Sequence, residues 1–361
     1  MNVVVERLRL APGEQVFGVG LPGLFVDLPA ALARAVEANG GVYVGTLGAI
    51  GPYGSLGDAD FREAAVGLDR EGLRELLRDV PVGVMLPGTS LADAPYGAMA
   101  DLLGEGLGEH RAIHFHWGGR YDVESRSIPV GAEAAAQPSD DPTADSLYRT
   151  AITTIDYDAL AAAQAAFEEA ARAGEIHVTT PAGTDLRFRI GDRPVNRQDG
   201  DASAERARRG RIIIDREIEF PSGALRVAPV ETTVSGLMVF PKSRWNGGEV
   251  ENLTLTIEEG RIVGIEASSG VEAARAELDA AGESAAFREL AVGFNPLLAV
   301  PEEDPWLPYF GYGAGVVRLS LGDNSELGGT VGGGYVRWIF VLDATVTIDG
   351  ATWVSDGRLT R

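Results

Sequence analysis

The first 120 residues alternate short apolar runs with stretches in which apolar residues recur at helical spacing. The apolar runs cover 14–20, 41–49, 82–88 and 111–119, and the helical patterns cover 29–41, 70–79 and 91–109. Short apolar runs of this length predict buried strands, and a repeat near 3.6 residues predicts amphipathic helices. Regular strand–helix alternation is typical of a parallel sheet with helices on both faces, so this part is predicted to be an α/β domain.

The pattern changes in the middle of the chain. Residues 121–147 are rich in Ser, Pro, Asp and Ala without periodicity, which predicts a linker or surface loop. A strong helical pattern follows at 155–174, where Asp156 or Asp158 is the expected cap and Gly174 the expected end. Beyond it, 175–190 holds two alternating runs around Pro-Ala-Gly, which predicts a hairpin.

Strand-like alternation dominates the rest of the chain. It covers 211–220, 251–267 and 315–361, with one further helix predicted over 271–289. We therefore predict two domains. An N-terminal parallel α/β domain spans 1–150, and a C-terminal mixed, mostly antiparallel α+β domain spans 151–361 and carries the functional pocket.

Charge and composition narrow the possible partners. The 361 residues include 53 acidic and 31 basic side chains, a net charge of -22, which argues against binding to nucleic acid or to an anionic membrane. There is no cysteine, which excludes disulfides, thiolate metal sites and cysteine nucleophiles. No apolar run reaches the roughly 18 residues of a membrane span, and charges interrupt the first residues, so a cytoplasmic location is expected.

Two short motifs in the N-terminal half are each open to two interpretations. GVGLPG at 18–23 has dinucleotide-binding glycine spacing, but Pro22 and the lack of an acid after the second strand favour a tight turn. His114 and His116 alternate on one strand and therefore face the same way. They either hold a metal together with a carboxylate or are half-buried histidines that hydrogen-bond to loops.

The most informative motifs lie between residues 181 and 340. They are PAGTDLRFRIGDRP, FPSGALRVAPVETTVSG, FRELAVGFNP, VVRLSLGDN and GGGYVRWIF. In order and spacing they resemble the thermophilic metallo-aminopeptidase family of the aminopeptidase S and T type, whose α/β domain the N-terminal alternation also matches. The resemblance implies a homodimer with a two-metal site that removes N-terminal residues from peptides. A distant branch of the fold is similar to the ring-opening dihydroxypyridine dioxygenases, which use a single iron.

Carried over position by position, the resemblance leaves one metal ligand of five in place. Glu289 survives, whereas Ala224 replaces a carboxylate and Arg318 replaces a histidine. The final His-x-Asp pair becomes Arg337 and Ile339. If the register of that strand differs by a residue, its neighbours Tyr335, Trp338 and Phe340 are no zinc ligands either. Because guanidinium groups keep their proton and repel cations, the metal is predicted to be absent and no cofactor is expected.

The arginines that take the place of ligands suggest two roles. Glu289 and one arginine form a buried ion pair that fills the former metal site, or one of Arg318 and Arg337 remains to bind a carboxylate or phosphate. In the second case Glu289 is the expected general base. Glu231 and Asp323 are expected at the pocket rim.

Three functions follow from these alternatives. The first is a metal-independent enzyme that acts on a small anionic substrate, such as an amino acid or a peptide-like molecule. The second is a metallo-aminopeptidase with a rebuilt divalent-metal site, zinc for example, drawn from Glu289, Glu219, His114 and His116. The third is a non-catalytic homodimer that binds a ligand or a partner protein.

Overall fold

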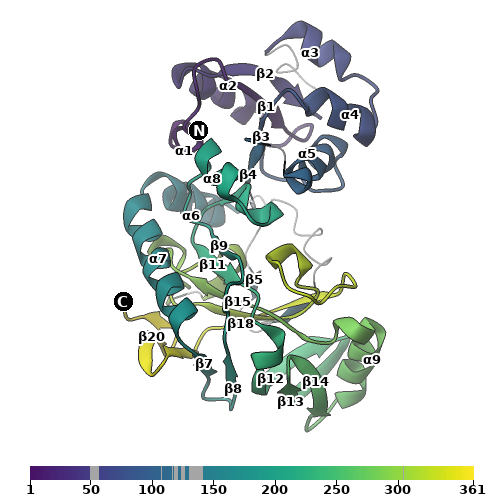
Figure 1. Cartoon of the computed structure of the whole chain (residues 1–361), viewed down its shortest axis with the longest axis vertical. Helices are drawn as coiled ribbons and strands as arrows, with labels where there is room; N and C mark the ends of the chain where they lie inside the picture. Colours follow the sequence, from purple (N-terminus) through teal and green to yellow (C-terminus); the bar gives the residue numbers. More distant parts are fainter. Residues whose placement is uncertain are drawn as a thin grey trace. The chain divides into compact units, whose positions relative to one another are not determined.

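The computed structural model describes residues 1–48, 57–106, 108–115, 117, 141–303 and 305–361, and the backbone of 121–122 and 127–129. The chain forms two compact units (Figure 1). The first unit contains 1–119, 137–154 and 200–222, and the second contains 120–136, 155–199 and 223–361. Among the described helices, none combines the length and the apolar character needed to cross a membrane.

The first unit is built on a five-stranded parallel sheet with the strand order β10-β4-β3-β1-β2. Its strands are β1 (Gln15–Val19), β2 (Val42–Leu47), β3 (Val82–Met85), β4 (Arg111–Phe115) and β10 (Glu217–Phe220). Its helices are α1 (Asn2–Leu8), α2 (Leu28–Ala38), α3 (Ala59–Ala64), α4 (Arg70–Leu77), α5 (Ala94–Glu105), α6 (Pro142–Thr153) and α8 (Ala204–Arg209).

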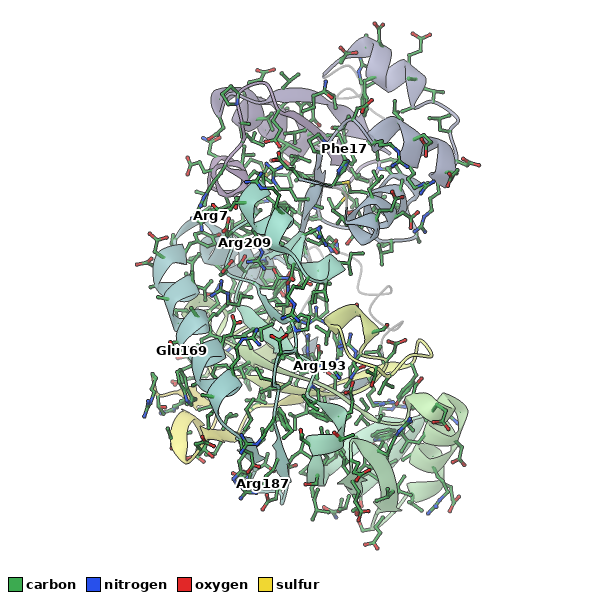
Figure 2. All side chains as sticks on the ribbon, in the orientation of Figure 1. Arg7, Phe17, Glu169, Arg187, Arg193 and Arg209 are labelled. Atoms are coloured by element: carbon green, nitrogen blue, oxygen red, sulfur yellow. The ribbon has the colours of Figure 1, made fainter. Side chains whose placement is uncertain are left out.

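Both faces of this sheet are covered, as the strand–helix alternation predicted. Phe17 of β1 is fully buried and belongs to a core that includes Leu77 of α4 and Met99 of α5 (Figure 2). The next residue, Gly18, faces the other side, where a Cβ atom would lie 3.1 Å from the Tyr43 hydroxyl and 3.2 Å from Leu32 of α2. Strand alternation therefore divides the apolar residues of β1 between two helical layers.

The loop after β1 does not have the form of a dinucleotide-binding turn. β1 ends at Val19 and α2 begins only at Leu28, so the glycines of GVGLPG do not open a helix. Asp27 precedes α2, and its negative charge would oppose a phosphate at that helix end. The interpretation as a connecting turn is the one that agrees with this geometry.

The described part of the second unit contains two large antiparallel sheets and a two-stranded one. The six-stranded sheet has the order β6-β18-β17-β15-β11-β9 and the eight-stranded sheet the order β14-β13-β12-β8-β7-β19-β20-β21. The first sheet comprises β6 (Ser127–Pro129), β9 (Val195–Arg197), β11 (Ala224–Val227), β15 (Phe287–Gly293), β17 (Val317–Gly322) and β18 (Val336–Val341). The second comprises β7 (Ile176–Thr179), β8 (Asp185–Phe188), β12 (Ser235–Trp245), β13 (Gly248–Glu258), β14 (Arg261–Glu266), β19 (Thr345–Ile348), β20 (Ala351–Ser355) and β21 (Arg358–Leu359). β5 (Tyr121–Asp122) pairs separately with β16 (Trp306–Leu307).

Two helices and several 3-10 turns complete this unit. The predicted cap is confirmed at α7 (Tyr157–Ala173), where Asp156 accepts hydrogen bonds from the backbone N–H groups of Asp158 and Ala159. The hairpin of β7 and β8 is confirmed as well. The helix predicted over 271–289 is too long: α9 (Val271–Ala281) ends before Gly282, which adopts φ 56°, and the apolar run after it forms β15.

Two segments depart from the predicted organisation. The strand predicted over 211–220 was expected in the C-terminal antiparallel part. It corresponds to β10, which pairs in parallel with β4 of the first unit. Part of the predicted linker, from Pro142 onward, is the start of α6. A single boundary near residue 150 therefore does not describe these units, since 200–222 returns to the first unit.

Candidate functional site

The FPSG turn leads into β11 and is shaped by close backbone packing. A Cβ atom on Gly223 would lie 2.7 Å from the Cβ of Asn295 and 2.8 Å from the Tyr312 carbonyl oxygen, so only glycine fits there. Asn295 in turn caps the 3-10 turn Pro296–Leu298, since its side chain accepts a hydrogen bond from the backbone N–H of Leu297. The turn thus fixes where Ala224 and the strand behind it begin.

The six-stranded sheet gathers polar residues on one face. Glu289 is in register with Ser320, and Ser320 with Trp338. Residues in register on adjacent strands point to the same side of a sheet, and side chains alternate along each strand. By this alternation the same face also carries Ala224, Arg226, Arg318 and Phe340.

Arg288 reaches this face because of an irregularity in β15. The register between β15 and β17 shifts between Phe287 and Glu289, so Arg288 is an extra residue opposite β17. Such a bulge re-aims a side chain that would otherwise point to the opposite face. It lets the consecutive residues Arg288 and Glu289 form an ion pair of 2.7 Å.

Glu289 is the centre of a cluster of three guanidinium groups, here called the guanidinium cluster. Its side chain has 0% exposed surface. One oxygen, Oε2, lies 2.7 Å from Arg288 Nη1 and 3.2 Å from Arg226 Nη2. The other, Oε1, lies 3.1 Å from Arg318 Nη2 and accepts a hydrogen bond of 3.0 Å from the Ser320 hydroxyl. The three arginines are themselves buried.

These contacts keep Glu289 ionised. Burial alone would raise the pKa of its carboxyl group, but the positive charges of the three arginines outweigh burial. Together with the Ser320 hydroxyl they hold the pKa of Glu289 well below its usual range. A carboxylate with so low a pKa is a poor proton acceptor at neutral pH, so the geometry does not favour Glu289 as a general base.

Glu326 joins the guanidinium cluster from a surface turn, Ser325–Leu327. Its Oε1 lies 2.8 Å from Arg226 Nη2 and also accepts a hydrogen bond from Arg288. The Glu326 side chain is 43% exposed, whereas those of Arg226 and Arg288 are 5% and 3% exposed. Of these three side chains, that of Glu326 is therefore the one exposed to solvent.

Arg318 is the least exposed of the three arginines, and aromatic side chains surround its guanidinium group. Its guanidinium carbon is 4.4 Å from the centroid of the Trp338 ring and 5.9 Å from that of Tyr312. Its Nη1 is 3.4 Å from the Phe310 carbonyl oxygen. Within the part of the chain that the structure describes, Arg318 Nε and Trp338 Nε1 are buried donors with no hydrogen-bond acceptor. Buried polar groups of this kind normally have a partner.

Arg337 does not belong to the guanidinium cluster, which corrects the expectation that it faces Glu289. It is in register with Leu321, one position away from Ser320, and so points to the opposite face of the sheet. There it makes two hydrogen bonds to Glu277 of α9, of 2.7 and 2.6 Å, and stacks 4.0 Å from the centroid of the Trp245 ring. If the last strand carries ligand positions that face Glu289, these are Trp338 and Phe340.

Glu231 and Asp323 hold a loop rather than point into a cavity. Glu231 accepts hydrogen bonds from Asn324 Nδ2 at 3.0 Å, from the Thr330 N–H at 2.7 Å and from Arg193, which Figure 2 labels. Asp323 accepts from the Ser325 hydroxyl and N–H and from the Gly334 N–H. Both residues therefore shape the segment that carries Glu326.

The residues of the rebuilt-metal hypothesis are spread over the two units. His114 and Glu219 are in register in the first unit, whereas Glu289 is in the second, and His116 lies outside the described residues. His114 Nδ1 is 2.7 Å from the Tyr96 hydroxyl, which donates its hydrogen to Glu217. Over the described residues, no three His, Asp or Glu side chains form a group suited to a metal.

A divalent metal does not fit the residues around Glu289 either. Among the described residues, the positions that face it carry alanine, arginine, serine and aromatic side chains, and the carboxylates come from Glu289 and Glu326. Both carboxylates are already bound by guanidinium groups. The donor set therefore suits anions better than cations.

Sequence reasoning missed Arg226, Arg288 and Glu326. Arg226 had a signal, since it stands two positions after Ala224 in a strand and must share its face. No local signal marks Arg288 or Glu326, because one depends on a bulge and the other on a turn folded against it.

Comparison with known proteins agrees with this architecture. Residues 157–296 match the thermophilic metalloprotease family M29. The structure is similar to 2,5-dihydroxypyridine dioxygenase from Pseudomonas putida KT2440, with a TM-score of 0.60 and 16% identity, covering 99% of this chain and 95% of that one. It is also similar to AmpT from Thermus thermophilus, with a TM-score of 0.57 and 18% identity, covering 100% and 99%. No curated protein sequence matches significantly.

These findings confirm the resemblance to the thermophilic metallo-aminopeptidases and the predicted fold class. At identities this low, the structural likeness shows the shared fold alone. Metal content, substrate and reaction depend on the residues of this chain.

Replacing Glu289 with Gln should change how stability depends on pH. Because the folded pKa of Glu289 is lowered, its stabilisation is present above the unfolded value of about 4.3 and is lost as pH falls below it. Glu289→Gln should cost roughly 3–5 kcal/mol at neutral pH, since it leaves the buried Arg318 without its acidic partner and Arg226 and Arg288 with Glu326 alone. Urea unfolding from pH 7 to 3 should show the difference from wild type shrinking below about pH 4. A constant difference would contradict this.

Arg337→Met should lower stability, because it leaves Glu277 without its bidentate partner. We expect a loss of roughly 2–3 kcal/mol, less than for a fully enclosed pair, since water reaches Glu277. Chemical denaturation measures it. The double variant Arg337→Met with Glu277→Leu should recover most of the loss, and a single variant as stable as wild type would rule out the structural role.

Proposed function

We propose that this chain, which has the M29 metalloprotease fold and part of that family's sequence pattern, is a metal-independent protein that binds a small anion at the guanidinium cluster. The proposal rests on the incomplete set of partners around the buried Arg318. Its one acidic contact among the described residues is Glu289, which it shares with two other arginines, and its Nε–H has no acceptor there. A ligand carboxylate or phosphate would supply that acceptor.

The surroundings of Arg318 favour an anion over other ligands. Trp338, whose ring stacks on Arg318, supplies a second buried donor, Nε1, that has no acceptor among the described residues. In a site of low exposure, charge-assisted hydrogen bonds to a guanidinium are worth roughly 1.5–3 kcal/mol each. The aromatic rings at Tyr312 and Trp338 would contact the apolar part of an organic anion.

The guanidinium cluster is better suited to binding an anion than to catalysing a reaction. The names of the relatives indicate a metalloprotease and a dioxygenase, but the positions around Glu289 do not supply ligands for a metal centre. Glu289 is also too weak a base to abstract a proton near neutral pH. An amino acid or a peptide-like molecule with a free carboxylate fits the cluster, and a homodimer remains the expected assembly.

Elemental analysis of the purified protein tests metal independence. We expect less than stoichiometric zinc, cobalt or iron, and no change in melting temperature after EDTA treatment, because the cluster has no free ligand set. Retention of one metal per chain through purification, together with destabilisation by EDTA, would instead support the rebuilt metallo-aminopeptidase site.

Arg318→Met tests the anion site itself. Titration calorimetry with inorganic phosphate, acetate and benzoate should detect binding of at least one probe to wild type, and the variant should bind it at least about tenfold more weakly. Arg187→Met removes an arginine of the same unit whose side chain is 51% exposed, and it should leave the affinity unchanged. Equal losses in both variants would show a general charge effect and no specific site.

A further inference from the structure

Glu326 has a position unlike that of the other acids around the guanidinium cluster. Its carboxylate bridges two nearly buried guanidinium groups through one oxygen, Oε1, while its side chain stays 43% exposed. A single oxygen shared by Arg226 and Arg288 is the contact that a carboxylate or phosphate ligand would make with such a pair. Glu326 thus resembles a tethered ligand more than a core ion pair.

The turn that carries Glu326 is held in place from behind. Asn324 is fully buried and links the turn to the Val331 N–H at 2.8 Å and to Glu231 at 3.0 Å. A side chain at Gly329 would collide with Asn324, so the loop packs without a gap there. These contacts hold the backbone of the turn, while the Glu326 side chain is exposed enough to rotate toward solvent.

Displacing Glu326 would leave no buried arginine unpaired. Without it, Arg288 keeps its 2.7 Å contact with Glu289, and Arg226 keeps one of 3.2 Å. The Glu326 side chain is 43% exposed, so the released carboxylate can turn from the two guanidinium groups into water, where its charge is well solvated. Exchange for a second anion therefore avoids the large penalty of breaking an enclosed pair.

Building on the proposed function, we infer that Glu326 occupies an anion subsite in the free protein and that the oxyanion of the ligand displaces it from Arg226 and Arg288. The ligand class is a small organic carboxylate or a phosphate, whose charged group contacts Arg226 and Arg288 in place of the Glu326 carboxylate. This is a second anion position of the cluster, distinct from the acceptor position at Arg318 Nε. Glu326 then lowers the affinity for every ligand, because each ligand has to compete with the Glu326 carboxylate for Arg226 and Arg288.

Glu326→Gln tests this inference with acetate, benzoate and inorganic phosphate as probes. Removing the competing charge should tighten binding of the preferred probe by about tenfold or more. Glu326→Asp, which keeps the charge on a shorter side chain, should give an intermediate gain. Glu258→Gln, an exposed carboxylate of the same unit, should give none. Phosphate and the two carboxylates separate the possible ligand chemistries.

The outcomes separate this inference from the proposed function. If wild type binds a probe through Arg318 but neither Glu326 variant binds more tightly, Glu326 is a structural cap and the displacement is wrong. If Glu326→Gln unfolds, Glu326→Asp still decides, since unchanged or weaker binding by that variant overturns the inference. If neither wild type nor any Glu326 variant binds a probe, the anion site itself fails, and the inference fails with it.

Discussion

A carboxylate with no exposed surface must find positive partners or lose its charge, and Glu289 satisfies that constraint with three guanidinium groups. Each of its oxygens has its own partners, Arg226 and Arg288 at Oε2 and Arg318 with Ser320 at Oε1. The partners come from three adjacent strands, so they meet only while those strands stay in register. Ion pairing and sheet register therefore support each other.

Within the proposed function, guanidinium groups provide the positive charge that a metal centre would supply on this fold. They differ from a metal in chemistry, because arginine cannot polarise a bound water or open a coordination position. What remains is directional hydrogen bonding to oxyanions. A site of this kind recognises a carboxylate well but lacks the means to activate water, which favours ligand recognition over peptide hydrolysis.

The same sheet carries a second ion-pair system on its other face. Arg337 pairs with Glu277 and stacks on Trp245, just as Arg318 pairs with Glu289 and stacks on Trp338. On each face, therefore, a buried arginine combines a carboxylate partner with an aromatic partner, an arrangement that suits the planar guanidinium. Among the described residues, the Glu289 face also carries Glu326, a partly exposed side chain whose carboxylate contacts two of the arginines.

Local patterns along the chain were sufficient to predict the parallel class of the first unit's sheet, the hairpin of β7 and β8, and a cap at Asp156 or Asp158. Strand–helix alternation, turn residues and capping residues are all read from neighbouring positions, and the structure selects Asp156 as the cap. Tertiary structure decided the rest. β10 joins a distant parallel sheet, and the bulge at Arg288 turns that side chain toward Glu289. Arg337 and Trp338 exchange their expected faces for the same reason, since side chains alternate every residue and only strand pairing fixes which of the two points toward the cluster.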